Sequence, residues 1–414
     1  MAGPPGPRTG LGPVGGIAVA IVSGFAILGS IALLGRAGAV PTIGSTVVPS
    51  SPPIARAAPP LPGHEVYGFV PYWEIDDSIA AHLRATDATT IGLFSVTHTD
   101  KGVLATSENG HRRLTGPIGR QIVADAHAAG RRVEVAWTSF GRAKNATLFE
   151  SAALQAKVIA ALVDFRAALG VDGIAVHVEG IDDGDIAAYG AFVSRLRSAL
   201  RSDEPDATVT VTTGGGRQGA ALALAATLAG ADRIFLMGYD YRTAGSEPGA
   251  SAPLARRDGD DRSLTWSLDL YAAAFVPVER TILGLPLYGL TWPTASSDVG
   301  SEATGPGDIW VPRRNLATIR HPEATPGYDT IEDVGVLAVP DGDGWQTVYY
   351  DTPQSLTPKL GLANARGLAG AGFWALGYER GLSDYTDLIA AFRAGRSMTL
   401  GGPGGAVAGV PGAP

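Results

Sequence analysis

The sequence predicts an α/β fold, a (β/α)8 barrel, because eight short apolar runs alternate with helical patterns over about 330 residues. The runs lie at 66–72, 89–96, 132–138, 171–178, 207–213, 233–239, 281–288 and 369–376. Ala-rich segments such as 148–170 and 185–202 separate them and have the spacing of helices. A doubly wound open sheet is the alternative, but no G-x-G-x-x-G motif opens a helix after the first strand.

Composition supports a folded chain and excludes several functions. Of the 414 residues, 45% are hydrophobic and 17% charged, which suits a large core and excludes a wholly disordered protein. Cysteine is absent, so disulfides, thiolate metal sites and a cysteine nucleophile are excluded. The net charge is −8, and Arg8 and Arg36 are the only charges before position 37, so the remainder carries −10. Such an acidic chain is not expected to bind nucleic acid.

The composition of the amino-terminal region predicts that the protein is exported. Residues 1–14 are Gly/Pro-rich and are expected to be disordered, and 15–34 form an uncharged run of 20 residues, long enough to cross a bilayer. We expect a transmembrane anchor or a signal peptide over 15–36, with Arg8 on the cytoplasmic side. The Ala37-Gly38-Ala39 sequence fits a signal-peptidase site, so cleavage after Ala39 is the alternative. The protein is then held on the outer face of the membrane or secreted.

The remaining boundaries follow from composition. Residues 37–63 are a Pro-rich linker, and 396–414 are a Gly/Pro-rich tail expected to be flexible. The folded unit is therefore predicted over 64–395. The stretch between the seventh and eighth strands is too long for one crossover helix, so a small insertion is predicted at about 295–350.

The end of the fourth predicted strand carries the strongest candidate for chemistry. Side chains alternate along a strand, so Ala175, His177 and Glu179 are expected to face the barrel axis, with Glu179 at the mouth. A carboxyl group there, partly buried beside aromatic walls, suits a general acid because burial favours its protonated form.

Four motifs, one on each of four strands, resemble glycoside hydrolase family 18, the chitinase-like barrels. The fourth strand reads DGIAVHVE (172–179), where the family has D-G-x-D-x-D-x-E, and Met237-Gly238-Tyr239-Asp240 matches M-x-Y-D. The runs ILGLPLYG (282–289) and GAGFWALG (370–377) also fit, and the 239–254 region is similar to the bacterial YaaH-type spore-germination and cell-wall branch. The resemblance covers about 66–390.

The resemblance implies roles for particular residues. Glu179 would be the acid that protonates the glycosidic oxygen, and the substrate's own acetamido group would be the nucleophile. Tyr239 would contact the acetamido oxygen, Asp240 would be its polar neighbour, and Trp374 would form the floor under the sugar. Further substrate-binding candidates are the aromatic residues near strand ends together with the first residue of the M-x-Y-D motif: Tyr72, Trp73, Trp137, Tyr288 and Met237.

The sequence departs from the family at two inward positions. Ala175 and His177 replace the two aspartates that precede the acid. Loss of a group that stabilises transition-state charge costs about 2.7–4 kcal/mol. Two functions therefore stay open: a slow retaining hydrolase of N-acetylglucosamine polymers (peptidoglycan or a chitin-like glycan), or a chitinase-like lectin that only binds them. A structural barrel without a glycan site is a third reading. No cofactor and no metal site are predicted, because the seven histidines are scattered and no H-E-x-x-H is present.

Overall fold

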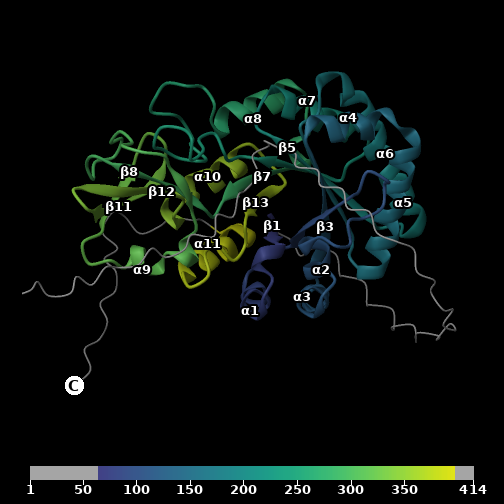
Figure 1. Cartoon of the computed structure of the whole chain (residues 1–414), viewed down its shortest axis with the longest axis horizontal. Helices are drawn as coiled ribbons and strands as arrows, with labels where there is room; N and C mark the ends of the chain where they lie inside the picture. The colour runs from purple at the N-terminus through teal and green to yellow at the C-terminus, as the bar shows by residue number, and fades with distance from the viewer. Residues whose placement is uncertain (1–63, 397–414) are drawn as a thin grey trace, which may run out of the picture. The chain divides into compact units, whose positions relative to one another are not determined.

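The computed structural model describes residues 64–396, which form a closed parallel barrel surrounded by helices (Figure 1). The strand order around the barrel is β1-β13-β7-β6-β5-β4-β3-β2, and every neighbouring pair is parallel. The barrel strands are β1 (Glu65–Pro71), β2 (Thr90–Thr97), β3 (Arg132–Phe140), β4 (Gly173–Glu179), β5 (Thr208–Gly214), β6 (Arg233–Met237), β7 (Thr281–Pro286) and β13 (Gly370–Trp374). All eight predicted strands are present, and the predicted fold class is confirmed.

Helices follow most of the strands and cover the outside of the barrel. They are α1 (Asp77–Ala85), α2 (Asn109–Leu114), α3 (Pro117–Ala128), α4 (Arg142–Glu150), α5 (Ala152–Leu169), α6 (Ile186–Asp203), α7 (Arg217–Leu228), α8 (Leu264–Ala273), α10 (Pro353–Ala365) and α11 (Ser383–Arg393). The helix expected over 148–170 is divided, because the Ser151 side chain accepts the backbone N–H of Leu154 at 3.2 Å and caps a new helix. Within 64–396 no single helix is long and apolar enough to span a membrane; α4 and α5 together meet that test but meet at 99°.

An antiparallel sheet is inserted between β7 and β13, as the sequence predicts. Its order is β10-β11-β12-β8-β9. The strands are β8 (Gly289–Thr294), β9 (Asp308–Trp310), β10 (Thr325–Asp329), β11 (Val334–Asp341) and β12 (Gly344–Tyr350), with the short helix α9 (Leu316–Ile319) between β9 and β10. The sheet therefore begins before the predicted boundary at 295. Trp310, Leu337 and Val348 form a small core of its own.

Aromatic side chains fill the barrel interior. The ring of Phe235 lies 5.6 Å from that of Tyr67 and 5.0 Å from that of Phe69. Glycines on the neighbouring strands leave room for them: a Cβ atom at Gly284 would lie 2.4 Å from the Phe235 ring, and one at Gly372 would lie 2.3 Å from it. This packing closes the barrel below the mouth, so a ligand has access only from the carboxyl ends of the strands.

A buried carboxyl group lies on β3, below these rings. Glu134 is 2% exposed, and it accepts hydrogen bonds from the Tyr67 hydroxyl at 2.9 Å and the Thr208 hydroxyl at 2.6 Å. Burial raises the pKa of Glu134, and these hydrogen bonds partly oppose the rise. Two hydroxyl donors thus satisfy this polar group, which belongs to the barrel core and not to the mouth.

The predicted anchor or signal segment (15–36), the linker (37–63) and all but the first residue of the tail (396–414) lie outside the described residues.

Candidate active site

The end of β4 brings the candidate acid and its neighbour into contact. Glu179 is the last residue of β4, and its side chain is 41% exposed at the mouth. The His177 side chain lies one inward position below and is 6% exposed, with Nε2 2.7 Å from Oε1 of Glu179. Both residues therefore point as the alternation predicts, and they form one hydrogen-bonded pair.

Two aromatic rings enclose the imidazole of His177. Phe94 from β2 and Phe140 from β3 meet it edge-on, at centroid distances of 5.4 Å and 5.5 Å. Its Nδ1 atom is buried and has no hydrogen-bond partner. A buried lone pair without a partner costs less than a buried N–H without one. The arrangement therefore favours the tautomer in which Nε2 carries the proton and donates a hydrogen bond to Oε1 of Glu179.

The turn after β6 supplies a second carboxylate. Asp240 has a positive φ of 62°, and its backbone N–H donates to the Ser251 hydroxyl at 3.0 Å. The Tyr288 hydroxyl donates to Oδ1 of Asp240 and lies 3.0 Å from the Ser251 hydroxyl. Asp240 is thus fixed by groups from two other segments, although solvent reaches its outer side.

The pKa values of Tyr239 and Asp240 are both raised, in part by the charge of Glu179. Desolvation within the mouth raises the pKa of Asp240, and the negative charge of Glu179 raises it further, against hydrogen bonds from Tyr288 and Ser251. Desolvation also raises the pKa of Tyr239, with contributions from the charges of Asp240 and Glu179. Tyr239 is consequently a neutral hydroxyl that can donate a hydrogen bond to a ligand oxygen.

Aromatic residues from three strand ends form one wall of the mouth. Trp374, the last residue of β13, lies 4.7 Å from the Phe94 ring and 6.5 Å from the Trp73 ring. Tyr72 packs edge-on against Trp73 at 4.9 Å, and Met237 ends β6 half-buried. Tyr72, Trp73, Trp374 and Met237 therefore lie at the carboxyl ends of the strands, as predicted.

Of the other two predicted substrate-binding residues, Trp137 lies away from the mouth, and Tyr288 lies in the mouth but is buried. Trp137 is fully buried, with its ring 5.1 Å from Phe192 of α6, so it packs between the barrel wall and a helix. Its position in the strand explains this, because Trp137 alternates with Thr138 and Phe140 and so faces outward. Tyr288 is 3% exposed and uses its hydroxyl on Asp240, so its place is beside the carboxylate and not on an open surface.

Sequence reasoning missed two residues near Glu179. Phe140 is 36% exposed, lies in register with Glu179 and contacts His177. Asn145 on α4 is fully buried, and its amide donates to the backbone carbonyl of Glu179 at 2.7 Å. The Ser139 hydroxyl fixes the same amide by donating to its carbonyl oxygen at 2.6 Å. Asn145 thereby positions the end of β4.

A buried ion cluster joins the three segments on the Trp73 side of the mouth. Glu74 has no exposed surface and binds Arg313 at 2.6 Å, Arg314 at 2.9 Å and Arg380. These residues come from the β1–α1 loop, the insertion and the β13–α11 loop. The Trp73 indole N–H donates to the Tyr378 hydroxyl at 3.2 Å, which links the first and third of these loops again. The cluster therefore holds the aromatic wall in place.

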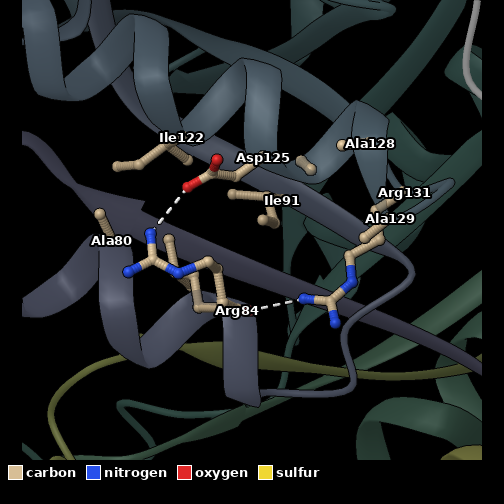
Figure 2. Close-up of a pocket in the computed structure, with 10 residues that line it drawn as sticks. Ala80, Arg84, Ile91, Ile122, Asp125, Ala128, Ala129 and Arg131 are labelled. Atoms are coloured by element: carbon tan, nitrogen blue, oxygen red, sulfur yellow. Dashed lines mark hydrogen bonds and ion pairs between the residues drawn. The ribbon is translucent and has the colours of Figure 1, made fainter.

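A cavity on the outside of the barrel is separate from the mouth. It has a volume of about 320 Å³ and lies between α1 and α3, with a mostly apolar lining (Figure 2). Figure 2 shows Arg84 extending toward Asp125 across it, and their 2.8 Å ion pair satisfies both charges. Among residues 64–396, no group of three or more His, Asp or Glu side chains is arranged to hold a metal ion.

The fold and the mouth together define a class of protein. A closed (β/α)8 barrel with a carboxyl group at the end of β4 and an aromatic wall beside it is the architecture of the chitinase-like barrels. Residues 66–379 match the model of glycosyl hydrolases family 18. The chain belongs to this family, and the prediction from the four motifs is confirmed.

Individual relatives are distant. Mouse chitotriosidase-1 is 25% identical over 263 residues, which cover 58% of this chain and 56% of that protein. The chain thus spans about half the length of this curated relative. Among solved structures, the Bacillus cereus spore cortex-lytic enzyme SleL has a TM-score of 0.64 at 19% identity, covering 80% of this chain and 74% of that one. A family 18 chitinase from Cycas revoluta, solved with (GlcNAc)3, has a TM-score of 0.66 at 19% identity, covering 79% and 99%.

Proposed function

We propose that this protein is a slow retaining glycoside hydrolase of β-1,4-linked N-acetylglucosamine polymers, with Glu179 as the general acid. The observation that supports this most is the placement of Glu179: it ends β4 at an open mouth, beside Tyr239, Asp240 and the Trp374 wall. A protein that only binds sugar has no need of a carboxyl group held in this position. The relatives whose names state chitinase activity support the same substrate class.

The proposed reaction runs in two steps. A protonated Glu179 gives its proton to the glycosidic oxygen while the acetamido carbonyl oxygen of the sugar attacks the anomeric carbon, so that the leaving sugar departs and an oxazolinium ion forms. Water then attacks the anomeric carbon, and the Glu179 carboxylate accepts its proton. The Tyr239 hydroxyl, neutral at physiological pH, hydrogen-bonds the acetamido oxygen, and Trp374 packs against the sugar ring.

His177 acts on Glu179 and not on the substrate. Its Nε2 is engaged by Glu179 and its Nδ1 is buried, so neither ring nitrogen is available to the acetamido group. Because no carboxylate lies at this position to stabilise the developing positive charge, we expect a low turnover number.

A second candidate function is glycan binding without turnover. It is favoured by Ala175 and His177, which stand where the family has two aspartates, and by the hydrogen bond from His177 that occupies one oxygen of Glu179. In this case the aromatic wall and Tyr239 would suffice for recognition.

We also propose that the protein acts outside the cell membrane. The uncharged run at 15–34 and the linker at 37–63 support an anchored barrel, and cleavage after Ala39 would give a secreted one. Peptidoglycan, which lies outside the membrane, is then the nearest N-acetylglucosamine polymer.

Product release from N-acetylglucosamine oligomers and from peptidoglycan tests the proposal. The full chain is compared with Glu179→Gln, which keeps the shape of the side chain but carries no transferable proton. Glu150→Gln is the control, because Glu150 is an exposed carboxylate at the end of α4. We expect turnover to vanish in Glu179→Gln and to persist in the control, with oligomer affinity within a few-fold.

The other outcomes separate the two functions. Binding without turnover in the unmodified chain would establish the lectin. Full activity in Glu179→Gln would show that another group is the acid.

A further inference from the structure

The end of the barrel opposite the mouth carries three exposed apolar side chains. Leu228, the last residue of α7, is 79% exposed; Phe275, just after α8, is 85% exposed; and Val278, which begins the short helix Val278–Arg280, is 41% exposed. Each lies in a segment that leads into the amino end of a barrel strand, so all three are at the same end. We term Leu228, Phe275 and Val278 the base patch.

Packing brings the members of the base patch to one region. α7 packs against α8. The Arg280 guanidinium donates to the backbone carbonyl of Ala231 at 3.3 Å, which ties the segment after α8 to the turn after α7. The patch is thus carried by two adjacent helix ends.

The backbone conformation at position 275 does not favour a phenylalanine. Glycines with positive φ stand at the ends of five other helices: Gly130, Gly170, Gly230, Gly367 and Gly395. Phe275 occupies the same place after α8, with φ 61°, and the Val276 N–H closes the turn onto the Tyr271 carbonyl at 3.0 Å. A bulky residue is strained there, where glycine is not. Since the ring also packs against little of the described chain, neither the backbone nor the core accounts for a phenylalanine.

The amino-terminal segment enters the fold beside this patch. The backbone N–H of Glu65, at the start of β1, donates to the Ala369 carbonyl at 3.1 Å, and the Ala369 N–H donates to the Val278 carbonyl at 3.1 Å. Sixty-three residues precede His64, and they include the uncharged run at 15–34 and the linker at 37–63. In an anchored chain the tether would therefore join the fold at the base of the barrel, which favours this end facing the bilayer.

We propose that the base patch docks on the surface of a lipid bilayer, so that the mouth faces away from the membrane. The proposal rests on the membrane anchor proposed above. Phe and Leu side chains insert into the boundary between headgroups and acyl chains, where exposed apolar surface leaves water. Three side chains suffice because the anchor raises their effective concentration at the surface.

The absence of cysteine allows a direct test on the full chain. Phe275→Cys introduces a unique thiol for a nitroxide label, whose apolar ring takes the place of the phenyl ring, and the protein is reconstituted into phosphatidylcholine–phosphatidylglycerol vesicles. Val103→Cys is the matched control, because Val103 is 53% exposed in the loop after β2, on the mouth side. We expect the ratio of oxygen to nickel-chelate collisions to rise several-fold at position 275 on vesicle binding and to stay unchanged at position 103.

A second variant separates docking from folding. Phe275→Gly suits the local φ, so the melting temperature should stay the same or rise, whereas a label at Leu228→Cys should lose its bilayer contact in this background. If the protein floats with the vesicles but the collision ratio at position 275 does not rise, the proposed anchor is supported and the proposed docking is overturned. If the protein does not float with the vesicles, both the anchor and the docking proposals are overturned. Dipolar broadening between labels on different molecules would show that a second copy of the chain covers the base patch, which would also overturn docking on the bilayer.

Discussion

His177 Nε2 lies 2.7 Å from Glu179 Oε1, and this contact ties the candidate acid to a buried imidazole. The imidazole occupies one oxygen of the Glu179 carboxyl group, whereas a general acid has to present its proton to the glycosidic oxygen. The phenyl rings of Phe94 and Phe140 keep the imidazole in place. The residue two positions before Glu179 therefore helps to fix the orientation of the candidate acid.

His177→Asp should raise turnover of N-acetylglucosamine oligomers. An aspartate places a negative charge below the reacting sugar and removes the imidazole that engages Oε1 of Glu179. A group aimed at transition-state charge contributes about 100- to 1000-fold in rate, which is the upper limit of the expected gain. Initial rates of the purified full chain and the variant measure it. His177→Asn is the control: an equal gain in this neutral variant would assign the effect to loss of the imidazole and not to the new charge.

Asn145→Ala should lower kcat more than it changes KM. The variant removes the 2.7 Å hydrogen bond to the Glu179 carbonyl and leaves the Ser139 hydroxyl without its partner. Loss of such buried hydrogen bonds costs about 1–3 kcal/mol, and displacement of a reacting group by about 1 Å can cost about 100-fold in rate. Steady-state kinetics and urea unfolding give the two quantities. Asn364→Ala, at an exposed position near the end of α10, is the control and should change neither kcat nor the free energy of unfolding. An unchanged kcat in Asn145→Ala would show that Asn145 does not position Glu179.

The barrel could be predicted because its signals are local. Each strand is a short apolar run bounded by turn residues, and the order of the four family motifs fixes which strand carries the acid. The sequence places Trp137 near the mouth because the apolar run ends at 138. In the structure the strand continues to Phe140, and the contacts of Glu134 and Phe140 inside the barrel show that Trp137 faces outward.

Other parts of the site depend on contacts between distant segments. Asn145 lies on a helix 34 positions before Glu179 in the chain, and nothing in its own neighbourhood indicates that contact. The same holds for Glu74, whose three arginines come from about 240 and 306 positions further on. Such pairs follow from the closure of the barrel, which a single sequence does not specify residue by residue.

His98 should make the protein less stable as the pH falls. It is 4% exposed, and burial, helped by the charge of Lys144, lowers its pKa to about 4 from the usual 6.5. Between pH 6.5 and pH 4 the unfolded chain therefore binds a proton that the folded chain does not. The free energy of unfolding consequently decreases as the pH is lowered through this range. The shift corresponds to roughly 3 kcal/mol.

Urea unfolding at several pH values measures this effect in the unmodified chain and in His98→Gln. The variant lacks the titrating group, so its stability should fall less over the same range. His321→Gln, at an exposed position, is the control and should follow the unmodified chain. Parallel curves for His98→Gln and the unmodified chain would show that His98 does not carry this pH dependence.

Glu74→Gln should loosen the aromatic wall and destabilise the barrel. The glutamate is fully buried and holds arginines from two other loops, so the neutral variant leaves three guanidinium groups without their shared counter-charge. Breaking a buried ion pair by changing one partner costs about 3–5 kcal/mol.

Because Trp73 directly precedes Glu74 in the chain and contacts Trp374, we also expect weaker binding of N-acetylglucosamine oligomers. Arg314→Gln should have a smaller effect, since Arg314 is 39% exposed and Arg313 and Arg380 still bind Glu74. Thermal unfolding and oligomer titration test this order, and equal stability of Glu74→Gln and the unmodified chain would show that the cluster does not hold the three loops together.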